Sequence, residues 1–209
     1  DVVIDFSSES GVDAYGEAAA ARGIAIVSAV SVYAEQRQRR LQSLARSTPV
    51  LWSPNITLGI NVVLLAAQMF RRIAPDADVQ VIEEHFRTKP ETSGTALRLA
   101  LALGVPDEGI HSVRAGGIVG VHEVVFGFPE QTIRLRHEAI SRAAFGAGAV
   151  FAASHLVGRP PALYRMEDLL APYFDAAGVR GPDRWEPVSG MRGRIAGGLR
   201  VAEQAREHR

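Results

Sequence analysis

The chain has 209 residues, carries 23 basic and 23 acidic side chains, and contains no cysteine. Its length allows one large domain or two small domains with hydrophobic cores. The balanced charge argues against binding to nucleic acid or to an anionic membrane, and the lack of cysteine excludes disulfides, thiolate nucleophiles and cysteine-ligated metals. No apolar run reaches the length of a membrane span, so we expect a cytoplasmic protein.

Short apolar runs alternate with helical patterns in the first part of the chain. Strands are predicted at residues 2–4, 24–27 and 50–52, with helices over 12–22 and 34–46 between them. This order predicts a parallel sheet, the second half of a doubly wound nucleotide-binding fold. Because the chain opens directly on a buried-strand pattern, we expect the native fold to include a preceding segment.

The segments that follow these three strands are candidates for ligand binding, because ligands of such sheets bind beyond the carboxyl ends of the strands. They are residues 6–8, 28–31 and 53–55. The amide of Asn55 has two open interpretations, a contact with a nicotinamide carboxamide or a cap for the following helix. Trp52 is interpreted as apolar filling.

An α+β part is predicted from residue 56 onward. A first helix places one apolar face at helical spacing, formed by Ile60, Val63, Leu64, Ala67 and Phe70. A strand over 78–85 and a helix over 95–103 follow, and Gly104 ends this helix. The helix is expected to place Leu97, Ala100 and Leu101 on one apolar face. Further strands are predicted at 110–114, 118–126 and 131–138, the last two as a hairpin.

The segment between strand 78–85 and helix 95–103 gathers chemistry-bearing residues in one loop. An imidazole such as that of His85 suits proton transfer near neutral pH. Lys89 lies just before the Ser93-Gly94-Thr95 turn, and a cation beside a helix N-terminus favours an anionic ligand. Glu83 and Glu84 either orient the neighbouring cations or are solvated. Other expectations are an ion pair between Arg87 and Glu84, apolar filling by Phe86, and no metal cluster.

This stretch resembles the substrate-site signature of the 4-hydroxy-tetrahydrodipicolinate reductase (dihydrodipicolinate reductase) family, Glu-x-His-His-Arg-His-Lys followed by Ser-Gly-Thr-Ala. The matching positions are Glu83, His85, Arg87, Lys89 and residues 93–96, whereas Phe86 and Thr88 replace two histidines. Further similarities at residues 5–7, 53–61, 114–122, 139–149 and 156–170 extend the resemblance over about residues 1–170.

Two features of the family are altered in this chain. Its Gly-Thr-Thr-Gly segment is replaced by Ser28-Ala29-Val30-Ser31, so two side chains are expected to intrude on the cofactor. The Gly-x-x-Gly-x-x-Gly phosphate loop is absent from the first strand–helix units. A similar glycine pattern occurs at residues 189–197, which form either a solvated basic tail or a relocated phosphate loop.

The resemblance implies a doubly wound, Rossmann-like parallel sheet, incomplete at the N-terminus, over residues 1–55. It also implies an α+β substrate-binding and oligomerisation domain with a mixed open sheet over 56–140. Residues 141–170 would return to the first domain, and 171–209 would be a C-terminal extension. The activity it implies is reduction of a cyclic imine or enamine carboxylate by NADPH or NADH in lysine and diaminopimelate synthesis, in a homotetramer.

The resemblance also implies residue roles, with His85 and Lys89 as proton donors. The implied substrate-binding residues are Phe86, Arg87, Ser93, Gly94 and Thr95. The implied cofactor-binding residues are Phe6, Ser7, Ser28, Ala29, Val30, Ser53, Asn55 and Ile56. The expected partner is a small carboxylated substrate, with no nucleic acid, membrane or metal.

Two alternatives stay open at this point. A redox-neutral dehydratase, cyclase or isomerase would use His85 and Lys89 for proton transfer alone, and the lost glycines favour it. A catalytically silent homologue would keep only the oligomer-forming sheet, although the complete set of His85, Lys89 and the Ser-Gly-Thr turn argues against it. Binding of a reduced nicotinamide separates the reductase from both.

Overall fold

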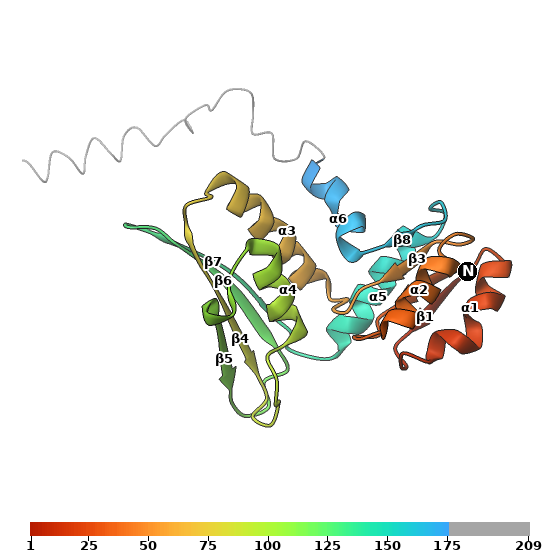
Figure 1. The fold of residues 1–209 in the computed structure, drawn as a ribbon, viewed down its shortest axis with the longest axis horizontal. Coiled ribbons are helices and arrows are strands. Elements are labelled where there is room, and N and C mark those ends of the chain that lie inside the picture. Colours follow the sequence, from red (N-terminus) through yellow and green to blue (C-terminus); the bar gives the residue numbers. More distant parts are fainter. Residues whose placement is uncertain (176–209) are drawn as a thin grey trace, which may run out of the picture. The chain divides into compact units, whose positions relative to one another are not determined.

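A computed structural model of the protein describes residues 1–175, of which residues 1–172 form one compact unit (Figure 1). Two four-stranded sheets organise this unit. The interpretation of residues 189–197 lies outside the described residues, as does most of the expected extension 171–209. No helix in the described part of the chain is both long and apolar enough to cross a membrane.

The first sheet is parallel throughout, as predicted. Its strand order is β1-β2-β3-β8, and its strands are β1 (Val2–Asp5), β2 (Ala25–Ser28), β3 (Val50–Trp52) and β8 (Leu163–Tyr164). Helices α1 (Gly11–Ala21) and α2 (Glu35–Leu44) pack on one face, and α5 (Ala143–Leu156) and α6 (Met166–Asp175) pack on the other. Helices on both faces explain why the strands read as continuous apolar runs.

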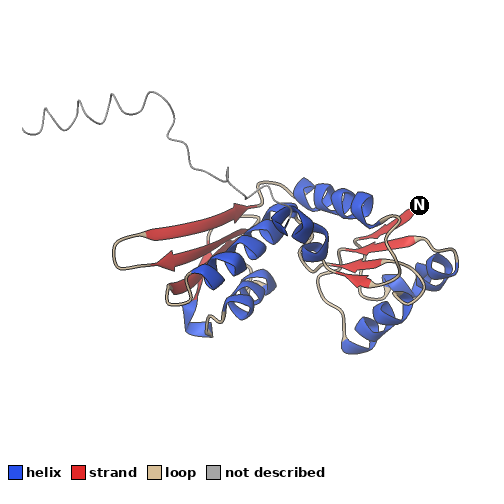
Figure 2. Ribbon diagram, turned by 90° about the horizontal axis from the view of Figure 1, so that it is seen from above, coloured by secondary structure: helices blue, strands red, loops and turns tan. Residues whose placement is uncertain are grey.

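The second sheet is mixed, with the order β5-β4-β6-β7. Strand β5 (Ile110–Arg114) pairs parallel to β4 (Asp78–His85), while β6 (Val121–Gly127) and β7 (Thr132–Glu138) add antiparallel. Helices α3 (Leu58–Ile73) and α4 (Gly94–Leu103) cover one face, and the short helix η1 (Asp107–Gly109) precedes β5 (Figure 2). Both predicted sheets are therefore present, and the fold class is confirmed.

Helix α4 begins and ends where its sequence indicates. Ser93 caps its start, because the Ser93 Oγ accepts a hydrogen bond from the backbone N–H of Ala96 at 3.1 Å. Gly104 ends it with a left-handed φ of 68°. The predicted apolar face with Leu97 and Leu101 is not the buried one, because these two side chains are 47% and 84% exposed.

The buried face of α4 consists of Ala96, Leu99, Ala100 and Leu103. Both this set and the predicted set have i, i+3, i+4 spacing. The helix is apolar almost all round, so its sequence carries no polar stripe that would choose between the two faces.

Candidate active site

A cavity of about 460 Å³ lies where the carboxyl ends of β2 and β3 face α4 and the end of β4. This volume is in the usual range for small-molecule sites. The side of the first sheet contributes Ser31, Val32, Pro54 and Asn55. The opposite side contributes residues of the predicted catalytic loop and of β6 and β7, namely His85, Lys89, Ser93, Gly94, Thr95, Gly120, His122 and His137. The cavity therefore brings together three segments that the sequence singled out, namely residues 28–31, residues 53–55 and the loop after β4.

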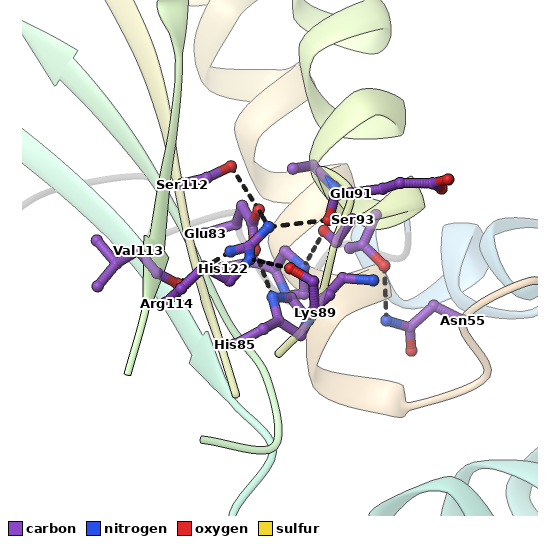
Figure 3. Close-up of polar contacts among 12 residues, drawn as sticks. Asn55, Glu83, His85, Lys89, Glu91, Ser93, Ser112, Val113, Arg114 and His122 are labelled. Carbon is purple, nitrogen blue, oxygen red and sulfur yellow. Dashed lines mark hydrogen bonds and ion pairs between the residues drawn. The ribbon is translucent and has the colours of Figure 1, made fainter. Parts of the chain in front are cut away.

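His85 is the last residue of β4, and its ring is held by the carboxylate two residues earlier. Its Nδ1 forms a short hydrogen bond with Oε2 of Glu83, which is fully buried (Figure 3). The second carboxylate oxygen of Glu83 accepts hydrogen bonds from Ser112 Oγ and from Arg114 Nη2, each at 2.6 Å. Glu83 thus orients its neighbours and is not solvated, which decides between the two interpretations of this residue.

The carboxylate of Glu83 is ionised. Burial by itself would raise its pKa, but the hydrogen bonds from Arg114, Ser112 and His85 outweigh burial and lower the pKa to about 2. An ionised Glu83 can only accept hydrogen bonds, so His85 Nδ1 carries the hydrogen. The other ring nitrogen, Nε2, is then left for a ligand in the cavity that His85 lines.

Lys89 brings the second predicted proton donor to the cavity wall. Its side chain is half-buried, and its ammonium group forms no ion pair among residues 1–175. Its loop is fixed through the main chain, because Arg114 Nε donates to the carbonyl of Lys89 at 3.1 Å and Arg114 Nη2 donates to that of Glu91 at 2.9 Å (Figure 3). An uncompensated cation beside the N-terminus of α4 favours an anionic ligand.

The hydroxyl of Ser93 is occupied by the protein itself. Its Oγ accepts from the N–H of Ala96 and is hydrogen-bonded to His122 Nε2 at 2.8 Å. The pKa of His122 is lowered to about 3, mainly by burial and to a smaller extent by the nearby His85, so this ring is neutral. Ser93 thus holds the turn in place, and Gly94 and Thr95 are the members of the turn that remain for a ligand.

Asn55 joins the two sides of the cavity. Its Nδ2 donates to Thr95 Oγ1 at 2.9 Å, and its Oδ1 accepts from the backbone N–H and the hydroxyl of Thr57 at the start of α3. The capping interpretation of Asn55 therefore has direct contacts in its favour. The same contacts connect the strand end of the first sheet to the turn before α4.

The other residues predicted to bind the cofactor lie at the strand ends but do not line the cavity. Ser28 is buried with its Oγ 2.8 Å from the Tyr33 hydroxyl, and the hydroxyl of Ser53 donates to the carbonyl of Asn55. Ile56 is buried in the core. Phe6 and Ser7 are exposed at the end of β1, where the hydroxyl of Ser7 donates to Asp5.

The segment that replaces the family glycines lies at the end of β2, beside the cavity. Ser28 and Ser31 take the places of the two family glycines. The hydroxyl of Ser28 is buried against Tyr33, whereas Ser31 lines the cavity, and Ala29 and Val30 between them pack into the two hydrophobic cores of the first sheet. The backbone turns their side chains inward and leaves Ser31 and Val32 at the cavity. The residues present therefore fit the nicotinamide end of a dinucleotide. Within residues 1–175 no glycine-rich loop is present for its phosphates.

Two residues of the catalytic loop lie away from the cavity. Phe86 is 42% exposed, so its interpretation as apolar filling is wrong; it follows the end of β4 and leaves the sheet. Arg87 is exposed, and the expected ion pair with Glu84 is absent. Glu84 instead lies 3.4 Å from Arg136 of β7, in the same sheet. Trp52 packs edge-on against Tyr33 and also donates a hydrogen bond to the carbonyl of Val30.

Sequence reasoning missed the residues that support the site from β5, β6 and β7. Arg114, His122 and His137 are distant in sequence from the catalytic loop and become its neighbours only through strand pairing. Among the described residues, the buried Nδ1 of His137 has no hydrogen-bond partner. Pairing of Glu83 with Ser112 and of His85 with Arg114 could have been deduced only from the strand register.

A parallel α/β layer whose strand ends face a pocket with a histidine and a lysine is the arrangement expected of a nicotinamide-dependent reductase with a separate substrate-binding layer. Sequence profiles support this class. The profile described as "Dihydrodipicolinate reductase, N-terminus" matches residues 1–56, and "Dihydrodipicolinate reductase, C-terminus" matches residues 59–170.

Individual relatives agree with the profiles. The chain is 35% identical to the 4-hydroxy-tetrahydrodipicolinate reductase of Caldanaerobacter subterraneus over 81% of this chain and 76% of the relative. It is 37% identical to the enzyme of the same name from Myxococcus xanthus over 81% and 72%. The fold resembles dipicolinate-bound dihydrodipicolinate reductase from Paenisporosarcina sp. TG-14, with a TM-score of 0.69 at 22% identity, over 80% of this chain and 73% of that chain.

The chain belongs to the dihydrodipicolinate reductase family, whose members are NAD(P)H-dependent reductases acting on a cyclic imine.

Proposed function

We propose that this protein reduces 4-hydroxy-tetrahydrodipicolinate with NADPH or NADH in the synthesis of diaminopimelate and lysine. The observation that supports this most strongly is the composition of the single cavity described above. His85, Lys89 and the Ser93–Thr95 turn face the carboxyl ends of β2 and β3 across it. A nicotinamide at the strand ends would thus meet a substrate at the catalytic loop.

The residues of the chain divide the work of binding and proton transfer. The backbone N–H groups at Gly94 and Thr95, together with the ammonium of Lys89, hold a substrate carboxylate. When bound, the reduced nicotinamide would supply the hydride that reduces the cyclic imine. Electron density then moves to the ring nitrogen, where it is neutralised by a proton from the ammonium of Lys89 or from the imidazolium form of His85, which carries hydrogen on Nε2 as well as on Nδ1. Val32 and Leu97 provide apolar wall around the reacting ring.

Binding of the two ligands can be tested separately from turnover. Titration of the 209-residue chain with NADPH and NADH, followed by nicotinamide fluorescence, is expected to show saturable binding. Dipicolinate, the ligand of the Paenisporosarcina enzyme, serves as a stable dicarboxylate probe. We expect it to raise the affinity for the reduced nicotinamide. Dipicolinate binding without any nicotinamide binding would instead favour the redox-neutral alternative.

The roles of the two proton donors are tested by matched substitutions. Lys89→Met and His85→Gln are expected to lower kcat by about 10²- to 10⁴-fold, the usual contribution of general acid catalysis. Arg72→Met, which removes an exposed cation from α3, and His111→Gln, which removes an exposed histidine, are expected to stay within about twofold of the wild type. Equal loss in the variants and their controls would reject the assignment.

Assembly and location follow from the same family membership. We propose a homotetramer in which further copies cover the face of the second sheet that α3 and α4 leave uncovered. That face carries the half-buried apolar side chains of Ile82 and Val125. We also propose a cytoplasmic location, because the reaction draws on the reduced nicotinamide pool there.

A further inference from the structure

One arginine of β5 contacts both parts of the machinery that holds the proton donors. Arg114 Nη2 donates to the buried carboxylate of Glu83, which in turn accepts from His85 Nδ1. The same guanidinium donates through Nε and Nη2 to the carbonyls of Lys89 and Glu91, in the loop that presents the second donor. Figure 3 shows these contacts converging on the Arg114 side chain.

The fork geometry of the guanidinium is what makes this arrangement possible. Nε, Nη1 and Nη2 all take part, since Nη1 donates to the carbonyl of Val113 at 2.9 Å. A lysine at this position would keep the charge, but its ammonium could not hold a carboxylate and two loop carbonyls in fixed directions. Strand pairing places Arg114 directly beside His85, and Ser112 beside Glu83.

We propose that Arg114 and Glu83 form a positioning unit that fixes the ring of His85 with Nε2 toward the cavity and fixes the Lys89 loop at the same time. This inference rests on the proposed function for its kinetic consequences, but its structural content does not. Neither residue lines the cavity, so both act through the donors that they hold.

The unit makes a specific prediction about the tautomer of His85. Arg114 and Ser112 both donate to Oε1 of Glu83, so in Glu83→Gln the amide oxygen is retained by these two donors. The amide N–H group then faces His85 Nδ1 and forces it to become an acceptor. The hydrogen moves to Nε2, and the nitrogen offered to the ligand changes from acceptor to donor, the same inversion that disables an Asp-to-Asn serine protease.

The tautomer is read by long-range ¹H–¹⁵N correlation spectra of the 209-residue chain at a pH where the ring is neutral, with His85 assigned from the spectrum of His85→Gln. The wild type is expected to show hydrogen on Nδ1, and Glu83→Gln is expected to show it on Nε2. A wild type with hydrogen on Nε2, or a variant with an unchanged tautomer, would overturn the proposal whether or not the chain reduces an imine.

Enzyme kinetics tests the proposal in a second way, independent of the tautomer. Arg114→Lys is expected to lower kcat by about 10²-fold with a smaller change in KM, and Arg114→Ala is expected to regain activity when guanidinium is added at non-denaturing concentration. Arg37→Lys and Arg37→Ala are the controls, because Arg37 pairs with Glu9 and Asp13 on the first sheet's helices. They are expected to keep kcat and to show no response to guanidinium.

The two arms separate this proposal from the proposed function. A chain without turnover but with the expected tautomer change would reject the function and keep the positioning unit. Wild-type kcat in Arg114→Lys, or equal rescue of the Arg37 and Arg114 variants, would reject the positioning unit and leave the function standing. Circular dichroism of each variant verifies folding, and the tautomer in Glu83→Gln decides if the Arg114 variants do not fold.

Discussion

Burial disfavours the charged form of two neighbouring side chains of the site, Glu83 and His122, but only Glu83 remains charged. Glu83 keeps its charge because three donors compensate for the loss of water, whereas burial and the nearby His85 lower the pKa of His122 and leave its ring neutral. The cavity wall thus combines a fixed negative charge behind His85 with a neutral ring behind Ser93. The charged side chains that line the cavity are then the ammonium of Lys89, the exposed carboxylate of Glu91, and Arg98, which pairs with Glu167.

The lowered pKa of His122 predicts a pH dependence of stability. Its pKa falls from 6.5 to about 3 in the folded protein, so the unfolded chain binds the proton first as the pH is lowered. The free energy of unfolding is therefore expected to fall between pH 6.5 and 3, with a slope from this group of up to about 1.4 kcal/mol per pH unit. Urea unfolding at several pH values measures the slope.

The variant His122→Gln isolates this contribution, because glutamine offers a hydrogen-bond partner to Ser93 and does not titrate. Its unfolding free energy is expected to depend less steeply on pH in that window than the wild type. Glu83 adds a separate loss at lower pH, because its stabilisation is present above pH 4.5 and is lost as the pH falls to about 2. An unchanged slope in His122→Gln above pH 4.5 would contradict the assignment.

Among the elements, helix α5 fixes the segment between the two sheets. Gly148 of α5 packs directly against the carbonyl of Ile56, so a Cβ at this position would overlap with that oxygen. The Ile56 segment leads from Asn55 to α3 and thus from the strand ends to the substrate side. The close approach of α5 therefore sets the position of one cavity wall.

Gly148→Ala is expected to reduce the free energy of unfolding by about 1–3 kcal/mol, the usual cost of overpacking. Gly146→Ala is the control in the same helix, because its Cβ would meet nothing within 4 Å. There we expect a small gain of about 0.5–1 kcal/mol from helix propensity. Urea denaturation of both variants gives the comparison, and equal effects would show that the contact with Ile56 is unimportant.

The sequence was informative where one element determines the answer. Strand β4 and the capped start of α4 follow from an apolar run and from Ser93, and both lie where predicted. The sequence was uninformative about contacts that depend on how two separate elements pack or pair. The buried face of α4, the inward turn of Ala29 and Val30, and the place of Arg114 beside His85 each depend on packing or register between distant segments.

At the scale of the whole molecule, the uncovered face of the second sheet predicts self-association. Val125→Arg places a second cation beside Arg134 on that face and is expected to lower the mass in light scattering coupled to size-exclusion chromatography. Ile140→Arg, at a position that is 86% exposed after β7, is the control and should leave the mass unchanged. A wild-type protein that runs as a monomer would contradict the proposed tetramer.

The central claim is that the donors of one cavity serve reduction of an imine by a nicotinamide. The most direct test is a single-turnover experiment in which the 209-residue chain, a reduced nicotinamide and 4-hydroxy-tetrahydrodipicolinate are mixed and nicotinamide oxidation is followed. The wild type and Arg72→Met are expected to oxidise the nicotinamide at the same rate, and Lys89→Met about 10²-fold more slowly or worse. Substrate consumption without nicotinamide oxidation, or equal rates in the wild type and Lys89→Met, would contradict the claim.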